Sequence, residues 1–66
     1  MNIALRQARE TSGITQKELA KAAKITEVSY QRIEYGTQCP SLKTAQLIAN
    51  ALNSTLDELF SGGILQ

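Results

Sequence analysis

The sequence predicts a compact all-α domain built from five short helices. Two observations indicate this fold class: side chains that cap helices recur along the chain, and apolar residues recur between them at helical spacing. A third is the lack of the alternating β-branched and aromatic clusters that would predict strands. With 66 residues, 42% of them hydrophobic, the chain has the composition and length of a single globular domain, 1–66, in which 61–66 is a short C-terminal tail.

The first two helices are predicted from their termini. The first runs from about Asn2 to Thr11, and Gly13 provides a stop just after it. Thr15 and Glu18 then have the spacing of a capping box, in which each side chain accepts from the backbone N–H of the other residue. We therefore expect a second helix from Gln16, with three apolar residues on one face: Leu19, Ala20 and Ala23.

The third helix is expected to follow Thr26, which can cap it. Tyr30 and Ile33 lie one turn apart on one face of this helix, and Gly36 ends it. The stretch 36–40 is then the longest loop of the domain.

The last two helices have the same kinds of signals. Ser41 caps a fourth helix, and Asn53 can adopt the left-handed conformation that closes it. Thr55 and Glu58 form a second capping box, which opens a short fifth helix. The apolar residues of these two helices are Leu42, Ala45, Leu47, Ile48, Ala51 and Leu52 in the fourth, and Leu56, Leu59 and Phe60 in the fifth.

The residue inventory argues against an enzyme, a metal site and a membrane protein. The chain has no His and no glycine-rich phosphate loop, so we expect no catalytic residues and no cofactor. So short a chain also has little room for a pocket, so no small-molecule ligand is expected. Cys39, the one cysteine, completes no metal-ligand set; a small loop residue is the simplest interpretation, and a redox switch is the alternative. Without a long apolar run or a secretory signal, a cytoplasmic chain is expected.

The charges are unevenly distributed along the chain. Residues 1–43 hold all seven basic and four of the six acidic residues, a formal charge of +3, whereas residues 44–66 carry −2. The basic part could orient the molecule toward a polyanion, although a solvated helical surface of mixed charge gives the same pattern.

Residues 16–35 have the pattern of a helix-turn-helix. Ala20 supplies the small residue that two steeply crossing helices need where their backbones approach, and Thr26 caps the second helix directly after the turn. Apolar residues fit the wedge between the two helices: Leu19, Ala23, Ile25, Tyr30 and Ile33.

The sequence resembles the phage repressor and Cro type of helix-turn-helix proteins, also called the xenobiotic-response-element family. The likeness covers about residues 3–60 and implies a lambda-repressor-like fold, with double-stranded DNA as the partner. It lies in an ordered set of motifs: Leu5…Arg9, Ile14-Thr15-Gln16, Glu18-Leu19-Ala20, Arg32-Ile33-Glu34-x-Gly36, Pro40-Ser41-Leu42, Ile48-Ala49-x-Ala51-Leu52 and Leu56-Asp57-Glu58-Leu59-Phe60.

The resemblance places Glu27, Val28 and Arg32 at the positions that read bases. Arginine can donate to guanine through two N–H groups, valine can pack on a thymine methyl group, and glutamate can accept from cytosine N4. Arg32 could instead form a surface salt bridge with Glu27 or Glu34, which would contribute little. Because phosphates repel a carboxylate, Glu27 could instead act only by disfavouring some DNA sequences, without a favourable contact of its own.

The resemblance also implies a phosphate contact from Gln16, where the positive end of a helix dipole favours an anion. The further candidates for phosphate contacts are Lys17, Ser29, Gln31, Thr37, Gln38 and Lys43. Each of these side chains, like that of Gln16, could instead simply face solvent.

Three further expectations follow from the resemblance. Arg9 and Glu34 are expected to form a structural ion pair between two helices. Lys24 stands where the family has glycine, and a left-handed backbone there would cost about 1 kcal/mol. Tyr30 replaces a customary aliphatic residue, so its hydroxyl needs a partner.

The function implied is that of a bacterial or phage transcriptional regulator: a sequence-specific repressor acting as a homodimer on a pseudo-palindromic operator. The candidate dimer surface comprises Leu59, Ile64 and Leu65. The alternative is a protein-interaction module, such as an antitoxin-type partner that also binds DNA. A longer apolar tail than the one after Phe60 would favour that alternative.

Overall fold

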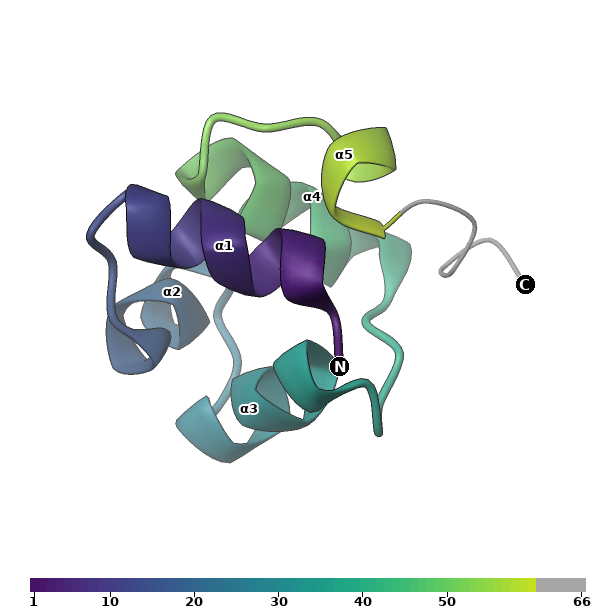
Figure 1. Ribbon diagram of the computed structural model, residues 1–66. Helices are drawn as coiled ribbons and strands as arrows, with labels where there is room; N and C mark the ends of the chain where they lie inside the picture. The colour runs from purple at the N-terminus through teal and green to yellow at the C-terminus, as the bar shows by residue number, and fades with distance from the viewer. Residues whose placement is uncertain (61–66) are drawn as a thin grey trace.

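The computed structural model describes residues 1–60, which form five α-helices and, within this range, no strand (Figure 1). The helices are α1 (Ile3–Thr11), α2 (Gln16–Ala22), α3 (Glu27–Tyr35), α4 (Leu42–Ala51) and α5 (Leu56–Phe60). α2 packs on α3 and α4, α1 packs on α5 and α3, and α4 packs on α5. The predicted all-α, five-helix architecture is confirmed.

Every helix begins at a side chain that satisfies backbone N–H groups of its first turn. Asn2, Thr15, Thr26 and Ser41 each accept from the backbone N–H three residues further on. The capping boxes at Thr15 and Thr55 are both formed, because each threonine exchanges hydrogen bonds with the glutamate three residues along. The first helix begins at Ile3 rather than at Asn2, since Asn2 has extended backbone angles and acts as the cap.

Left-handed residues end or follow four of the helices, α1 to α4. Gly36 closes α3 with φ of 87°, and Asn53 follows α4 with φ of 53°, as expected from the sequence. A Cβ at Gly36 would lie 3.4 Å from the backbone nitrogen of Met1, which is an ordinary van der Waals contact. The left-handed backbone is therefore what favours glycine at this position.

The core lies where the five helices meet, and every helix contributes to it. It is made of small and aliphatic side chains with two aromatic rings, one of which, Tyr30, is fully buried. The buried apolar residues are Leu5, Leu19, Ala20, Ala23, Tyr30, Ile33, Ala45, Ile48, Ala49, Leu52, Leu59 and Phe60.

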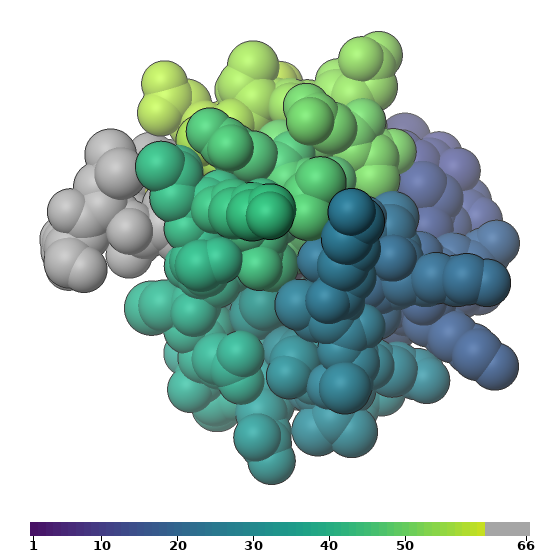
Figure 2. Space-filling view, turned by 180° about the vertical axis from the view of Figure 1, so that it is seen from behind, coloured from purple at the N-terminus to yellow at the C-terminus, as the bar shows by residue number. Residues whose placement is uncertain are grey.

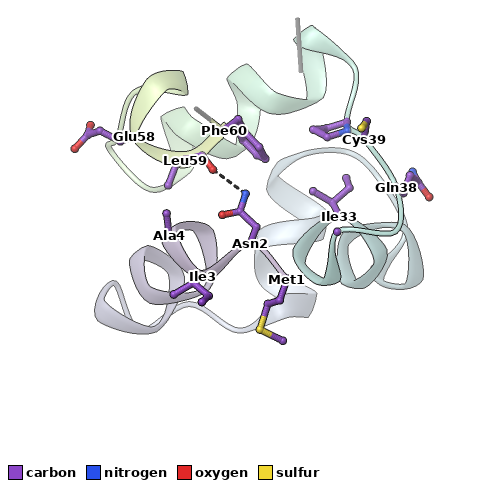
Figure 3. A pocket seen from close by; sticks show the side chains of 12 residues that line it. Met1, Asn2, Ile3, Ala4, Ile33, Gln38, Cys39, Glu58, Leu59 and Phe60 are labelled. Carbon is purple, nitrogen blue, oxygen red and sulfur yellow. Dashed lines mark hydrogen bonds between the residues drawn. The ribbon is translucent and has the colours of Figure 1, made fainter. Parts of the chain in front are cut away.

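Asn2 connects three helices at the start of the chain. Its backbone N–H donates to the Glu34 carbonyl at 2.8 Å, and its side-chain oxygen accepts from the Leu5 N–H at 3.0 Å. Its side-chain nitrogen donates to the Leu59 carbonyl at 2.7 Å (Figure 3). Through its backbone and its side chain, Asn2 thus joins the start of α1 to the ends of α3 and α5.

The core packing corrects one expectation about the dimer surface. Leu59 was expected to be exposed for a second copy, but its side chain is 3% exposed and packs among the core residues. Its spacing from Leu56 turns it toward α1 and α4 instead of solvent. The other two expected interface residues, Ile64 and Leu65, lie outside the described residues.

Candidate nucleic-acid interface

The helix-turn-helix is formed by α2, the turn 23–26 and α3. Ala20 is buried where the two helices approach, and its carbonyl accepts from the Ile25 N–H at 3.0 Å, which closes the turn. The expected wedge is confirmed: four of its five side chains are buried and Ile25 is half-buried. This packing fixes the angle at which α3 leaves the turn.

Lys24 occupies the left-handed position of the turn, with φ of 60°. A side chain with a Cβ is strained in this conformation, where glycine is not. The long Lys24 side chain is exposed, so the cost lies in the backbone and not in burial of the charge. The strain expected from the sequence is therefore present in the turn.

Arg9 of α1 and Glu34 of α3 form the expected ion pair. Arg9 Nε donates to Glu34 Oε1 at 2.8 Å, and both side chains are largely removed from solvent. A second guanidinium nitrogen, Nη1, donates to the Ile14 carbonyl at 3.0 Å. Arg9 thus ties α1 and the α1–α2 connection to the last turn of α3.

The same carboxylate accepts from two further side chains. The Tyr30 hydroxyl donates to Glu34 Oε1 at 2.8 Å, which supplies the partner that a buried tyrosine needs. The Gln16 amide donates to Glu34 Oε2 at 2.7 Å, and Gln16 Oε1 accepts from the Gln31 amide at 3.4 Å. Arg9, Gln16, Tyr30, Gln31 and Glu34 form one hydrogen-bonded chain, called here the Glu34 network.

The Glu34 network keeps its carboxylate ionised. Burial alone would raise the pKa of Glu34, but the hydrogen bonds from Arg9, Tyr30 and Gln16 outweigh it and hold the pKa below its ordinary value. The hydrogen bond to Glu34 raises the pKa of Arg9, and burial together with Glu34 raises the pKa of Tyr30. A charged carboxylate therefore sits between three donors inside the domain.

The predicted base-reading residues lie on the exposed side of α3. Val28 and Arg32 are one helical turn apart, and Glu27 begins the helix. Val28 is 54% exposed although it is apolar. The ion pairs among residues 1–60 are Arg6–Glu10 and Arg9–Glu34. Arg32 therefore forms no salt bridge with Glu27 or Glu34 within this range.

The predicted phosphate-contacting residues differ in their exposure. The exposed ones are Lys17, Thr37, Gln38 and Lys43, and the half-buried ones are Gln16, Ser29 and Gln31. The Thr37 hydroxyl donates to the Arg32 carbonyl at 3.3 Å, and Gln16 and Gln31 are engaged in the Glu34 network. Figure 2 shows the surface of α2, in blue, beside the teal surface of α3 and the loop that follows it.

Comparison with known proteins places the chain in a family. A family model described as helix-turn-helix matches residues 5–59. The chain belongs to the Cro/C1-type helix-turn-helix family. It is 35% identical over 60 residues to an Archaeoglobus fulgidus protein described as an uncharacterized HTH-type transcriptional regulator, in a match that covers 91% of this chain and 86% of that relative.

A solved structure agrees with this assignment. The Cro/C1-type chain is similar to the restriction-modification controller protein C.AhdI from Aeromonas hydrophila, with 30% identity, a TM-score of 0.79 and coverage of 86% of each chain. The expected family and fold are confirmed, and the chain is a DNA-binding helix-turn-helix transcriptional regulator.

The Cro/C1-type domain also carries an open groove beside the end of α3 (Figure 3). The groove has a volume of about 400 Å³ and lies between the start of α1, the end of α3, the α3–α4 loop and α5. Met1, Ile3, Ile33 and Phe60 line it, and Gln38 stands at the loop side. The expectation that so short a chain has little room for a concavity is wrong in this respect.

Two absences within residues 1–60 complete the description. No group of three metal-ligating side chains comes together among these residues. None of the helices described is long and apolar enough to span a bilayer.

Proposed function

We propose that this regulator is a sequence-specific repressor that binds double-stranded DNA as a homodimer and blocks a promoter by occupying it. The observation that carries the proposal is the two-sided character of α3. One side is locked into the domain by Tyr30, Ile33 and Glu34, while the other presents Val28 and Arg32 to solvent. A helix held in this way can enter a major groove without losing its orientation.

Base reading is assigned to three side chains of α3. Arg32 has no ion-pair partner among the described residues, so both of its N–H pairs are available for guanine O6 and N7. Val28 offers an apolar surface for a thymine methyl group, and Glu27 at the start of the helix can accept from cytosine N4.

Phosphate contacts are assigned to polar side chains on both sides of α3. Lys17 on α2 and Lys43 on α4 supply positive charge. Thr37 and Gln38 lie in the loop between α3 and α4. Ser29 and Gln31 on α3 and Gln16 on α2 complete the set. Such contacts fix the register of the protein on the duplex and carry no sequence information themselves.

Dimerisation is assigned to the face that bears the groove. Met1 and Ile3 are large apolar side chains exposed at its rim, and such a surface is a candidate for contact with a second copy. Gln38 belongs both to this rim and to the loop assigned to phosphate. Pairing through this face would bring the α3–α4 loops of the two copies close to each other, and half-sites for such a dimer are expected about 34 Å apart.

The test is an electrophoretic mobility shift with a random-sequence DNA library at 50 and 200 mM salt, followed by sequencing of the bound DNA. We expect a shifted band that weakens steeply at the higher salt and an enriched inverted repeat. A band that does not respond to salt, or no shift at all, would favour a protein-interaction module instead. Sedimentation of the free protein checks the dimer.

A further inference from the structure

The Glu34 network connects a core tyrosine to a residue at the DNA-facing surface. Glu34 Oε1 accepts from Arg9 and from Tyr30, each at 2.8 Å, and Oε2 accepts from Gln16 at 2.7 Å. Tyr30 is fully buried and Glu34 is 4% exposed, whereas Gln16 is half-buried at the start of α2. Gln16 is thus the member through which the network reaches solvent on α2.

The two carboxylate oxygens of Glu34 have different sets of donors. Oε1 has two short hydrogen bonds, while Oε2 depends on Gln16, because its second contact, from Arg9 Nη2, is long at 3.5 Å. Without the Tyr30 hydroxyl, Oε1 would keep only Arg9 and the buried carboxylate would lack a donor. Of the two remaining donors to Glu34, Arg9 and Gln16, Gln16 has the side chain that can turn toward Oε1 and replace the hydroxyl.

We propose that Tyr30 is a positioning residue for DNA binding: its hydroxyl holds the Glu34 carboxylate in the orientation that fixes the Gln16 amide beside a backbone phosphate. The proposal rests on the proposed function, because it assumes that Gln16 contacts phosphate. A primary amide has two N–H groups. Glu34 takes one of them, and the other has no partner among the described residues, so it can donate to a phosphate oxygen without breaking the network.

The charge of the network favours this arrangement. Arg9 balances the Glu34 carboxylate inside the domain, so the amide of Gln16 meets the phosphate as a neutral donor whose dipole is already oriented. Preorganised donors bind more tightly, because fewer rotamers are lost on binding. An aliphatic residue at position 30 would fill the wedge but could not supply this hydrogen bond.

The experiment is a double-mutant cycle on affinity for the selected operator, with Tyr30→Phe, Gln16→Ala and the double variant. Tyr30→Phe keeps the ring and removes only the hydroxyl. We expect each single variant to lose roughly threefold to tenfold in affinity, and the double variant to lose no more than Gln16→Ala alone. Tyr35→Phe is the matched control, because Tyr35 is exposed and its hydroxyl makes no hydrogen bond within the described residues.

Two further readouts separate positioning from a general loss of stability. Replacing the contacted phosphate by an uncharged methylphosphonate should weaken the wild type and leave Tyr30→Phe nearly unchanged. The NMR signals of the Gln16 side-chain amide in the free protein should shift in Tyr30→Phe and not in Tyr35→Phe. If Tyr30→Phe did not fold under the assay conditions, the same cycle is measured in the Lys24→Gly background, in which relief of the strained turn should stabilise every variant equally.

The outcomes distinguish this proposal from the proposed function. If the wild type binds its operator but the losses from Tyr30→Phe and Gln16→Ala simply multiply, the hydroxyl is structural only and the positioning role is wrong. Unchanged affinity in a folded Tyr30→Phe would also overturn the positioning role and leave DNA binding intact. If the wild type selects no DNA, both proposals fail together.

Discussion

The Gln16 amide donates to the Glu34 carboxylate across 2.7 Å and joins the first turn of α2 to the last turn of α3. The two helices of the helix-turn-helix are therefore held by a charged hydrogen bond as well as by their apolar wedge. Such a bond depends on distance and angle, whereas the hydrophobic effect is non-directional. The orientation of α3 relative to α2 is thus set by the apolar wedge together with a directional contact close to the proposed DNA-facing surface.

Stability should depend on the ionisation of Glu34. Because its pKa lies below the ordinary value of 4.5, the carboxylate stabilises the fold fully above that pH. This contribution is lost as the pH falls through the lower pKa of the folded state. We expect Glu34→Gln to lose about 2 kcal/mol at pH 7 and to unfold with a weaker dependence on pH below 4.5.

Urea unfolding of both proteins between pH 3 and pH 7 measures this difference. Glu10→Gln is the control, because the Glu10–Arg6 pair is exposed and should contribute about 0.5 kcal/mol or less. Parallel pH profiles for the wild type and Glu34→Gln would show that the network does not depend on this charge.

Relief of backbone strain at Lys24 should stabilise the domain. Lys24→Gly removes the Cβ at φ of 60°, and we expect a gain of about 1 kcal/mol in the free energy of unfolding. Lys21→Gly, three residues earlier inside α2, removes the same charge from a helical position and should instead lose about 1 kcal/mol. Two variants with equal effects in denaturant unfolding would contradict the strain.

Asn2 should contribute through two separate hydrogen bonds. Asn2→Ala removes both the cap on α1 and the donor to the Leu59 carbonyl, so we expect a loss of about 2 kcal/mol. Asn2→Ser keeps a cap acceptor but is too short to reach Leu59, and should lose about 1 kcal/mol. Thermal unfolding followed by circular dichroism measures both, and equal losses would mean that the contact with Leu59 contributes nothing.

Local signals in the sequence account for most of the fold that was predicted. Thr15 and Glu18 form a capping box because both partners lie within one turn, so their spacing alone determines the contact. The same holds for the left-handed Asn53, whose type tolerates that conformation. In these cases the sequence contains the whole interaction.

Contacts between distant segments could not be predicted in the same way. The Tyr30 hydroxyl meets Glu34 one turn further along the same helix, a local contact that their spacing of four residues could have indicated. Gln16 and Glu34, by contrast, are 18 residues apart and meet only because α2 packs on α3. Asn2 and Leu59 are 57 residues apart, and no local pattern joins an amide to a backbone carbonyl at that separation. The exposure of Leu59 was predicted wrongly, because an apolar residue in a terminal helix has the same pattern in a core as in an interface.

We propose that the exposed side of α3 reads bases through Arg32, and a measurement of base preference at each operator position tests this role. The affinities of wild type, Arg32→Ala and Lys43→Ala are compared on every single-base variant of the selected operator. We expect Arg32→Ala to lose about 1–3 kcal/mol on the best site and to relax the preference at one position in each half-site. Lys43→Ala should weaken all sequences alike and lower the salt dependence by about one counterion. If Arg32→Ala also weakened every sequence equally, Arg32 would be a phosphate contact and the assignment of base reading to it would be wrong.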